Sequence, residues 1–232
     1  MRIAIDLLTY LLYKYIEVKF SSLPLHKGLA MPIRTYLDPA APNADFRISK
    51  QWIDDRTYAT MVEKSVICCA DAIITLRGDI GAVYLAQRCV YPMKGFWCLG
   101  GRVFFNDPTD EHTIARAVEK ETGVQFERDR FRYLCVNDYV WACTAQGEFP
   151  GRNRASLYQL DVYRDELDQM SAGLSSTEYD TRFGLQRFDM QRMQEEAVHP
   201  AMLHALSMII DWKVGGTMSM LSPAAIAQAL AD

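Results

Sequence analysis

Two apolar runs separated by a short turn constrain the fold of this chain more than any other feature. Residues 66–74, VICCADAII, are apolar except for Asp71, and residues 82–90, AVYLAQRCV, follow the turn RGDIG. Apolar runs of this length on either side of a glycine-containing turn predict a β-hairpin. A second turn after it leads into FWCLGG at 96–101, so the sequence predicts a strand-rich block.

Helices and further strands follow this block. Residues 111–122 predict a helix, with Asp110 as its N-cap and Gly123 as the residue that ends it. Residues 131–143 and 155–163 predict strands, and 182–188 predict another short one. A helix at about 199–212 is expected to stop at a glycine pair, with a last helix after Pro223. This order of strands and helices predicts an α+β layered domain.

The two ends of the chain differ from the middle. Residues 21–50 are rich in Pro, Ala and Ser and predict a connector. We therefore expect a helical extension and connector at 1–48, the main domain at 49–195, and C-terminal helices at 196–232 packed on the domain or on a partner in a homodimer. Asp6, Lys14 and Glu17 interrupt the first apolar stretch before the ~20 residues of a membrane helix, so we expect no membrane span. An interfacial membrane helix is the alternative.

Composition limits the classes of partner. The net charge is −4 and no basic tract occurs, so nothing favours binding to nucleic acid. The 6 cysteines form no C-x-x-C pair and lie in apolar contexts. This pattern predicts reduced, buried thiols in a cytoplasmic protein, without disulfides or a thiolate zinc site.

A glycine pair at 100 and 101 precedes the charged helix and carries the clearest chemistry. Glycines let a backbone approach a ligand closely, and Arg102 beside them can reach a phosphate with a forked pair of hydrogen bonds. On the helix, Glu121 offers a hard oxygen ligand suited to Mg²⁺, whereas Ala117 on the same face cannot coordinate. The alternative for Glu121 is a solvated helix face of mixed charge.

This segment resembles a Nudix box, which runs Gly, five residues, Glu, seven residues, Arg-Glu, aliphatic, any residue, Glu-Glu, any residue, Gly, aliphatic. Aligned on its last glycine, the chain matches the motif at Arg116, Glu121, Gly123 and Val124. It departs from the three other glutamates at Pro108, Ala117 and Lys120. The loop before the helix is also one residue longer than in the motif.

Within the Nudix superfamily the chain is most similar to GDP-mannose mannosyl hydrolase, which lacks the same two helix glutamates. That family uses one Mg²⁺ and displaces the diphosphate from the sugar carbon. The resemblance spans roughly residues 50–190 and includes KGFWCLGGRV, VICCADAII and AVYLAQR. It implies a Nudix-type α/β/α sandwich with a mixed sheet, and metal-dependent (Mg²⁺ or Mn²⁺) hydrolysis of a nucleoside diphosphate sugar.

The resemblance also implies a role for each matched position. The metal ligands would be the Gly100 carbonyl, the Glu121 carboxylate and Thr177, which falls at the family's glutamine. Glu178 falls at the family's histidine and would be the base that activates water. The diphosphate would be bound by Arg88, Arg102 and Arg116. The nucleoside or sugar end would contact Asp71 and Tyr158. Structural alternatives are a turn acid for Asp71, a surface residue for Arg88 and a core aromatic for Tyr158.

Three functions stay open at this level. The first is the hydrolase, and the second is a Nudix-fold protein that binds a nucleotide sugar without turning it over. The residues that favour the second are Pro108, Ala117, Lys120, Thr177 and Glu178. The third is a pyrophosphatase that attacks phosphorus. The sequence does not identify the nucleobase or the sugar of the substrate. The loop with Arg152 and Arg154 is a candidate lid over the nucleobase or the phosphates, and the alternative is an exposed loop.

Overall fold

The computed structural model describes residues 54–104 and 107–220, with side chains up to residue 213. They all belong to one compact unit, Arg34–Asp232. The expected N-terminal extension, its connector and the last helix after Pro223 lie outside the described residues. Within the described part, no helix is long and apolar enough to cross a membrane.

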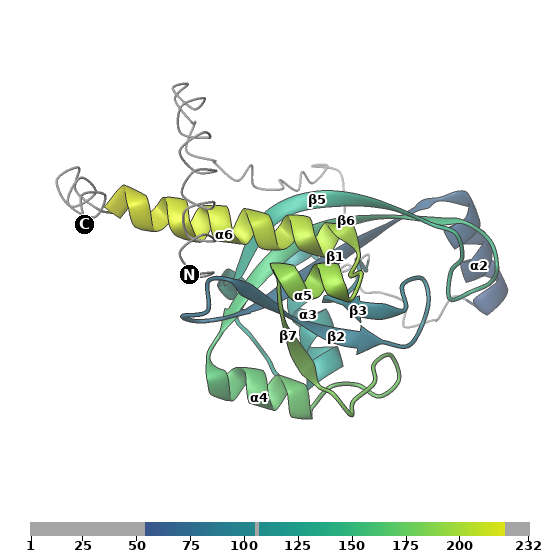
Figure 1. Cartoon of the computed structure of the whole chain (residues 1–232). Coiled ribbons are helices and arrows are strands. Elements are labelled where there is room, and N and C mark those ends of the chain that lie inside the picture. The colour runs from purple at the N-terminus through teal and green to yellow at the C-terminus, as the bar shows by residue number, and fades with distance from the viewer. Residues whose placement is uncertain (1–53, 105–106, 221–232) are drawn as a thin grey trace, which may run out of the picture. The chain divides into compact units, whose positions relative to one another are not determined.

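A mixed sheet forms the centre of the described unit (Figure 1). Strands β1 and β6 run parallel, while the other pairs are antiparallel. The strand order is β3-β2-β1-β6-β5, with β4 paired to β1 and β7 paired to β2. The strands are β1 (Val66–Leu76), β2 (Ala82–Arg88), β3 (Gly95–Trp97), β4 (Leu99–Arg102), β5 (Phe131–Trp141), β6 (Gly151–Val162) and β7 (Leu185–Asp189).

Helices cover both faces of this sheet because the strands are apolar on both sides. Ala70, Ala72 and Ile74 of β1 pack into one core with α3 (Asp110–Thr122) and α4 (Arg164–Ala172). Cys69 and Ile73 point to the opposite face and share a second core with α5 (Met190–Glu195) and α6 (Pro200–Met220). The predicted α+β sandwich with a mixed sheet is confirmed.

The apolar hairpin also forms as predicted, and it gives β1 a second neighbour. Ile74 pairs with Tyr84 across the hairpin. Nearer its start, β1 pairs with β4 instead, so that Asp71 lies opposite Gly100. Two different strands therefore share one edge of β1, and the glycine pair is brought against the only acid in the apolar run.

Helix α3 differs from the prediction at its first residues. Asp110 is the first residue of α3 and Thr109 is its N-cap, without a side-chain capping bond. The Asp110 carboxylate instead accepts a 2.5 Å hydrogen bond from the Ser156 hydroxyl on β6. The predicted end is confirmed, since Gly123 adopts the left-handed conformation with φ of 71°.

The C-terminal helix also differs from the prediction. The expected break at the glycine pair 215–216 is wrong, because α6 is helical through both residues. Glycine disfavours a helix by only about 1 kcal/mol, which the flanking turns can offset. Helices α4 and α5 were not predicted, and both are short and rich in polar residues, with few buried side chains.

Some expectations for loops and thiols change as well. Arg152 and Arg154 lie on β6 and both pair with Asp138 on β5, so they do not belong to a loop. All cysteines are free, as expected, but only Cys69 and Cys98 are buried, while Cys68 and Cys89 are exposed. The helix α2 (Asp55–Lys64) begins after an Asp54 cap that bonds the Thr57 amide at 3.0 Å.

We predict that α6 contributes to the stability of the domain through one face. Ile209 is fully buried in the core under α6, whereas neighbouring Ile210 is only partly buried. Ile209→Ala should lower the free energy of unfolding by about 2–5 kcal/mol. Ile210→Ala, the matched control, should lower it by less than about 1.5 kcal/mol. Urea unfolding measures both, and equal losses would show that α6 does not pack as described.

Candidate functional site

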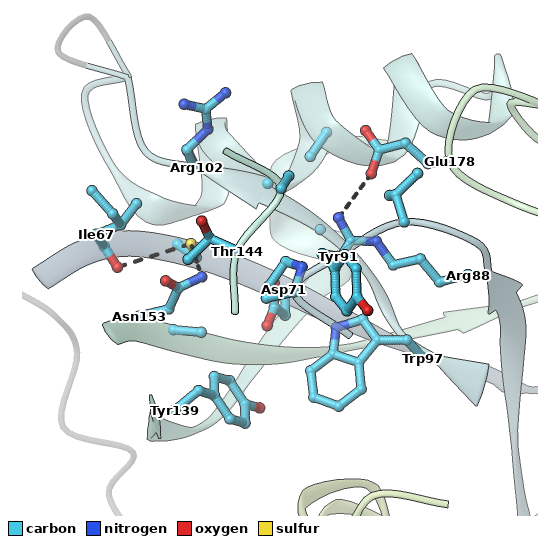
Figure 2. A pocket seen from close by; sticks show the side chains of 18 of the residues that line it. Ile67, Asp71, Arg88, Tyr91, Trp97, Arg102, Tyr139, Thr144, Asn153 and Glu178 are labelled. Atoms are coloured by element: carbon cyan, nitrogen blue, oxygen red, sulfur yellow. Dashed lines mark hydrogen bonds and ion pairs between the residues drawn. The ribbon is translucent and has the colours of Figure 1, made fainter. Parts of the chain in front are cut away.

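A cavity of about 660 Å³ is lined in part by Gly100 and Gly101 of β4 and by residues of α3. Its lining combines charged residues from β2, α3 and the loop after α4 with aromatic residues from β3 and β5. Figure 2 shows Arg88 and Glu178 joined at one end, Asp71 near the middle, and Thr144 and Asn153 toward the other end. Its size suits one nucleotide-sized ligand.

Glu121 is the centre of the charged end. Its side chain lies on the inward face of α3 and is 3 % exposed, although it is an acid. One carboxylate oxygen, Oε2, accepts hydrogen bonds from the Gly100 amide at 3.1 Å and from the Tyr179 hydroxyl at 2.9 Å. The recorded bonds therefore leave the other oxygen, Oε1, as the atom that could bind an ion.

Two acids of the cavity have raised pKa values. Burial, together with a smaller contribution from the neighbouring charge of Glu178, raises the pKa of Glu121 to about 8. Burial also raises the pKa of Asp71 to about 7, against the opposing charge of Arg88. Both carboxyls therefore favour a proton, or a bound cation, over an isolated negative charge.

The glycine pair is required by close packing. A Cβ on Gly100 would lie 2.2 Å from Asp71 Oδ1 and 2.8 Å from the Ala70 carbonyl. A Cβ on Gly101 would lie 3.1 Å from the Ala117 Cβ. Ala117, where the motif has glutamate, is thus buried against the second glycine. The small residue lets β4 and α3 approach each other.

Glu178 lies between two cations. Its carboxylate is 3.1 Å from Arg88 Nη2 and 3.5 Å from Lys120 Nζ, and the side chain is 26 % exposed. The backbone around it is fixed to the end of β2, because its carbonyl accepts from the Cys89 amide at 2.8 Å. The Asp180 amide donates to the Gln87 carbonyl at 2.8 Å. The structure thus brings together Arg88 and Glu178, two residues that were predicted for the site in separate roles.

Arg116 lines the cavity, but its guanidinium is engaged within the protein. It bonds both oxygens of Asp107, at 3.1 Å and 2.5 Å, and the Arg102 carbonyl at 3.0 Å. It also lies 3.9 Å from the centroid of the Phe104 ring. These contacts fix the chain that leaves β4, so the structure gives Arg116 a positioning role beside the expected diphosphate contact.

Arg102 has a different environment. Its guanidinium lies 4.2 Å from the ring centroid of Tyr58 on α2, and its side chain is exposed at the cavity. Within the described residues it forms no ion pair with a carboxylate. Its charge is therefore available to an anion.

Two predicted site residues lie elsewhere. Thr177 is exposed, is absent from the cavity lining, and shares a 2.7 Å hydrogen bond with the Ser175 hydroxyl. Tyr158 is 1 % exposed in the core under α3, where its hydroxyl donates to Glu111 at 3.1 Å. Its register partner is Ala72, so it faces the side of the sheet opposite to Asp71. The structural alternative for Tyr158, a core aromatic, is what the structure shows.

Other cavity residues were not predicted. Tyr179 is 3 % exposed and holds Glu121, but a tyrosine in a loop has no sequence pattern that would have identified it. The aromatic wall of Trp97, Tyr139 and Trp141 comes from two distant strands. Lys120, which departs from the motif, pairs with the predicted base.

The described side chains of the cavity offer few ligands for a metal ion. Among the described residues, no group of three or more His, Cys, Asp or Glu side chains could hold a metal ion. The described side chains thus offer a divalent ion one carboxylate oxygen, Glu121 Oε1, and the other ligands of such an ion would have to be backbone, water or phosphate oxygens. Thr177 is not part of this donor set in the structure.

Comparisons with known proteins were made by sequence and by structure. No protein-family profile and no curated protein matches the chain. Similar solved structures include a MutT/Nudix family protein from Listeria innocua, with 17% identity and TM-score 0.48, covering 68% of this chain and 100% of that one. An Ap4A hydrolase of C. elegans has 14% identity and TM-score 0.45, covering 65% and 99%.

A third similar structure is the Nudix domain of Shewanella oneidensis NrtR, solved with ADP-ribose. It has 17% identity and TM-score 0.43, covering 62% of this chain and 86% of that one. Likenesses this remote carry no information about activity. The function therefore has to come from the residues of the cavity.

We predict that Gly100 tolerates no side chain. Gly100→Ala places a methyl group against Asp71 and the Ala70 carbonyl, so it should lower the free energy of unfolding by about 3 kcal/mol or prevent folding. Gly81→Ala is the matched control, because nothing lies within 4 Å of the added atom. Its stability should change by less than about 1 kcal/mol. Thermal unfolding compares the two, and a stable Gly100→Ala protein would contradict this packing.

The raised pKa of Glu121 predicts a pH dependence of stability in metal-free buffer. Between its ordinary value near 4.5 and about 8, the folded state holds a proton that the unfolded state has released. Stability should therefore fall as pH rises through this window, by a few kcal/mol in order of magnitude. Glu121→Gln should remove this part of the loss. Urea unfolding at pH 5 and pH 8 measures it, and parallel losses in both proteins would refute it.

Proposed function

We propose that the chain is a metal-dependent hydrolase of the Nudix type that acts on a nucleoside diphosphate sugar. One observation carries the proposal. The Gly100 turn, the buried Glu121 carboxylate and the Arg88–Glu178–Lys120 group line the same cavity. Together they supply a cation ligand, cations for a diphosphate and a carboxylate base.

The cations of the cavity support binding of a diphosphate. Arg88, Arg102 and Lys120 line it, and Arg102 has no acidic partner in the described chain. Arg88 and Lys120 share one carboxylate, that of Glu178. An entering diphosphate offers more negative charge than this single acid and forms bidentate bonds with arginine. Binding of the anion therefore replaces an internal ion pair with a stronger external one.

Glu178 is the proposed base. Once the diphosphate engages Arg88 and Lys120, the carboxylate is free to accept a proton from water. The water oxygen attacks the sugar carbon, the bond from that carbon to the diphosphate oxygen breaks, and the nucleoside diphosphate leaves with the electron pair. Arg88 and Arg102 stabilise the charge that grows on the leaving group.

A divalent cation, Mg²⁺ or Mn²⁺, is proposed at Glu121 and the Gly100 backbone. When bound, the ion would neutralise charge on the diphosphate as a Lewis acid. The proposal of GDP-mannose as substrate rests on the sequence resemblance alone. Homodimer formation and a cytoplasmic location also remain predictions from the sequence.

A binding or regulatory protein is the second candidate, and one observation favours it. Ala117 is buried against Gly101, so the place of a metal-binding glutamate is filled by packing. Lys120 replaces a second glutamate and pairs with the proposed base. A protein built in this way could hold a nucleotide sugar without hydrolysing it.

Turnover with a panel of nucleoside diphosphate sugars separates these candidates. With Mg²⁺, we expect release of nucleoside diphosphate and sugar, lowered about 100-fold or more by Glu121→Gln or Glu178→Gln. Glu119→Gln is the matched control, since Glu119 is exposed on the same helix outside the cavity, and it should retain full activity. Binding without any turnover, insensitive to chelator, would exclude the hydrolase and support the second candidate.

The site of attack is tested in ¹⁸O-labelled water. Attack on carbon places the label in the sugar. Label found in phosphate would instead identify a pyrophosphatase that attacks phosphorus.

A further inference from the structure

Helix α2 supplies part of the cavity lining. Tyr58 and Val62 of α2 both line the cavity, and they lie four residues apart on one face of the helix. Val62 is buried, and a Cβ added to Gly151 at the start of β6 would lie 3.6 Å from its Cγ1. This packing seats α2 on β6 with Tyr58 at the cavity. No step of the proposed hydrolysis uses Tyr58.

The main chain at Arg102 is fixed on both sides. Arg102 is the register partner of Cys69 on β1, and the amide of the next residue, Val103, donates to the Cys68 carbonyl at 3.0 Å. The Arg102 carbonyl accepts a hydrogen bond from Arg116 Nη2, also at 3.0 Å. These contacts fix the point from which the Arg102 side chain starts, but none of them orients its guanidinium.

The Arg102 guanidinium instead contacts the ring of Tyr58, with its Cζ atom 4.2 Å from the ring centroid. Burial raises the pKa of the Tyr58 hydroxyl, while the nearby charge of Arg102 opposes this rise. The hydroxyl therefore keeps its proton at neutral pH, and the contact joins a cation to a neutral ring. Figure 2 shows Arg102 on the side of the cavity where Thr144 lies, apart from the joined pair of Arg88 and Glu178.

A ring can hold this arginine without competing for its hydrogen bonds. A guanidinium has five N–H donors, and an aromatic face attracts its charge without occupying these donors as a carboxylate would. Arg116 shows the contrast, because its N–H groups are bonded to Asp107 and to the Arg102 carbonyl. A side chain as long as arginine also loses rotamer freedom when a ligand fixes it. Contact with Tyr58 before binding reduces that loss.

We infer that Tyr58 is a positioning residue of the diphosphate site, because its ring holds the Arg102 guanidinium at the cavity with donors open to phosphate oxygens. This inference rests on the proposed function, in which Arg102 binds the diphosphate. It adds helix α2 to the elements that build the site. Tyr58 acts through Arg102 in this role and does not touch the reacting atoms.

The affinity for inorganic pyrophosphate tests this role, measured by calorimetry on the full-length chain with Mg²⁺. Tyr58→Leu should weaken binding about 3- to 10-fold, since the ligand then has to order Arg102 itself. Tyr58→Phe keeps the ring face and should stay within about twofold of the wild-type affinity. Met61→Leu is the matched control, because Met61 is exposed on α2 outside the cavity, and it should leave the affinity unchanged. If Tyr58→Leu fails to fold, Tyr58→Gln gives the same comparison, since glutamine suits a partly exposed helix position.

A double-mutant cycle separates positioning from a general effect on the fold. Arg102→Ala should weaken pyrophosphate binding about 10- to 100-fold. Adding Tyr58→Leu to Arg102→Ala should cause no further loss, because Tyr58 acts only through the guanidinium. A merely structural role of Tyr58 would give the same loss in both backgrounds, and that result would overturn the inference.

Two other results would overturn the inference and leave the proposed function intact. One is an unchanged affinity in folded Tyr58→Leu, and the other is an equal loss of affinity in Tyr58→Phe and Tyr58→Leu. Turnover of nucleoside diphosphate sugars without any binding of pyrophosphate would do the same. Absence of both turnover and pyrophosphate binding would overturn both proposals.

Discussion

The shared carboxylate oxygen of Glu121 is the contact on which the site depends. It accepts from Gly100 on β4 and from Tyr179 in the loop after α4, so one buried atom joins three segments of the chain. The main chain reinforces this junction, because the Ser175 amide donates to the Glu121 carbonyl at 2.7 Å. The junction can form only because residue 100 has no side chain that would meet Asp71.

The acidic and the basic side chains around this junction are not balanced by partners of opposite charge. Asp71 and Glu121 are buried acids with raised pKa values, so their ionised forms are stabilised only by a nearby cation. Arg88, Arg102 and Lys120, in contrast, have more positive charge than Glu178 can neutralise. A ligand that brings a divalent cation together with a diphosphate would satisfy both groups at once. This balance supports the proposed ligand over a neutral metabolite.

Local patterns predicted the parts of the fold that depend on neighbours in sequence. The hairpin of β1 and β2 and the end of α3 at Gly123 form as expected, because each rests on a turn or a cap. The sequence could not predict which face of the sheet each residue of a strand points to. Asp71 lies between two alanines in a run without alternation, so nothing in the sequence says which face it occupies. The register with β6 places it opposite to the face of Tyr158, which removes that tyrosine from the cavity.

The sequence by itself determined the glycine pair, the helix that follows it and the helix face that Glu121 shares with Ala117, but it left open whether that face is buried. These features follow from the helical period and from the small size of glycine, which act within a few residues. Only the tertiary structure decided that Tyr179 would hold Glu121, that Lys120 and Arg88 would share Glu178, and that rings from β3 and β5 would form one wall. Such contacts join residues far apart in the chain, and they are set by sheet register and by the packing of α3 against β4, which no local pattern records.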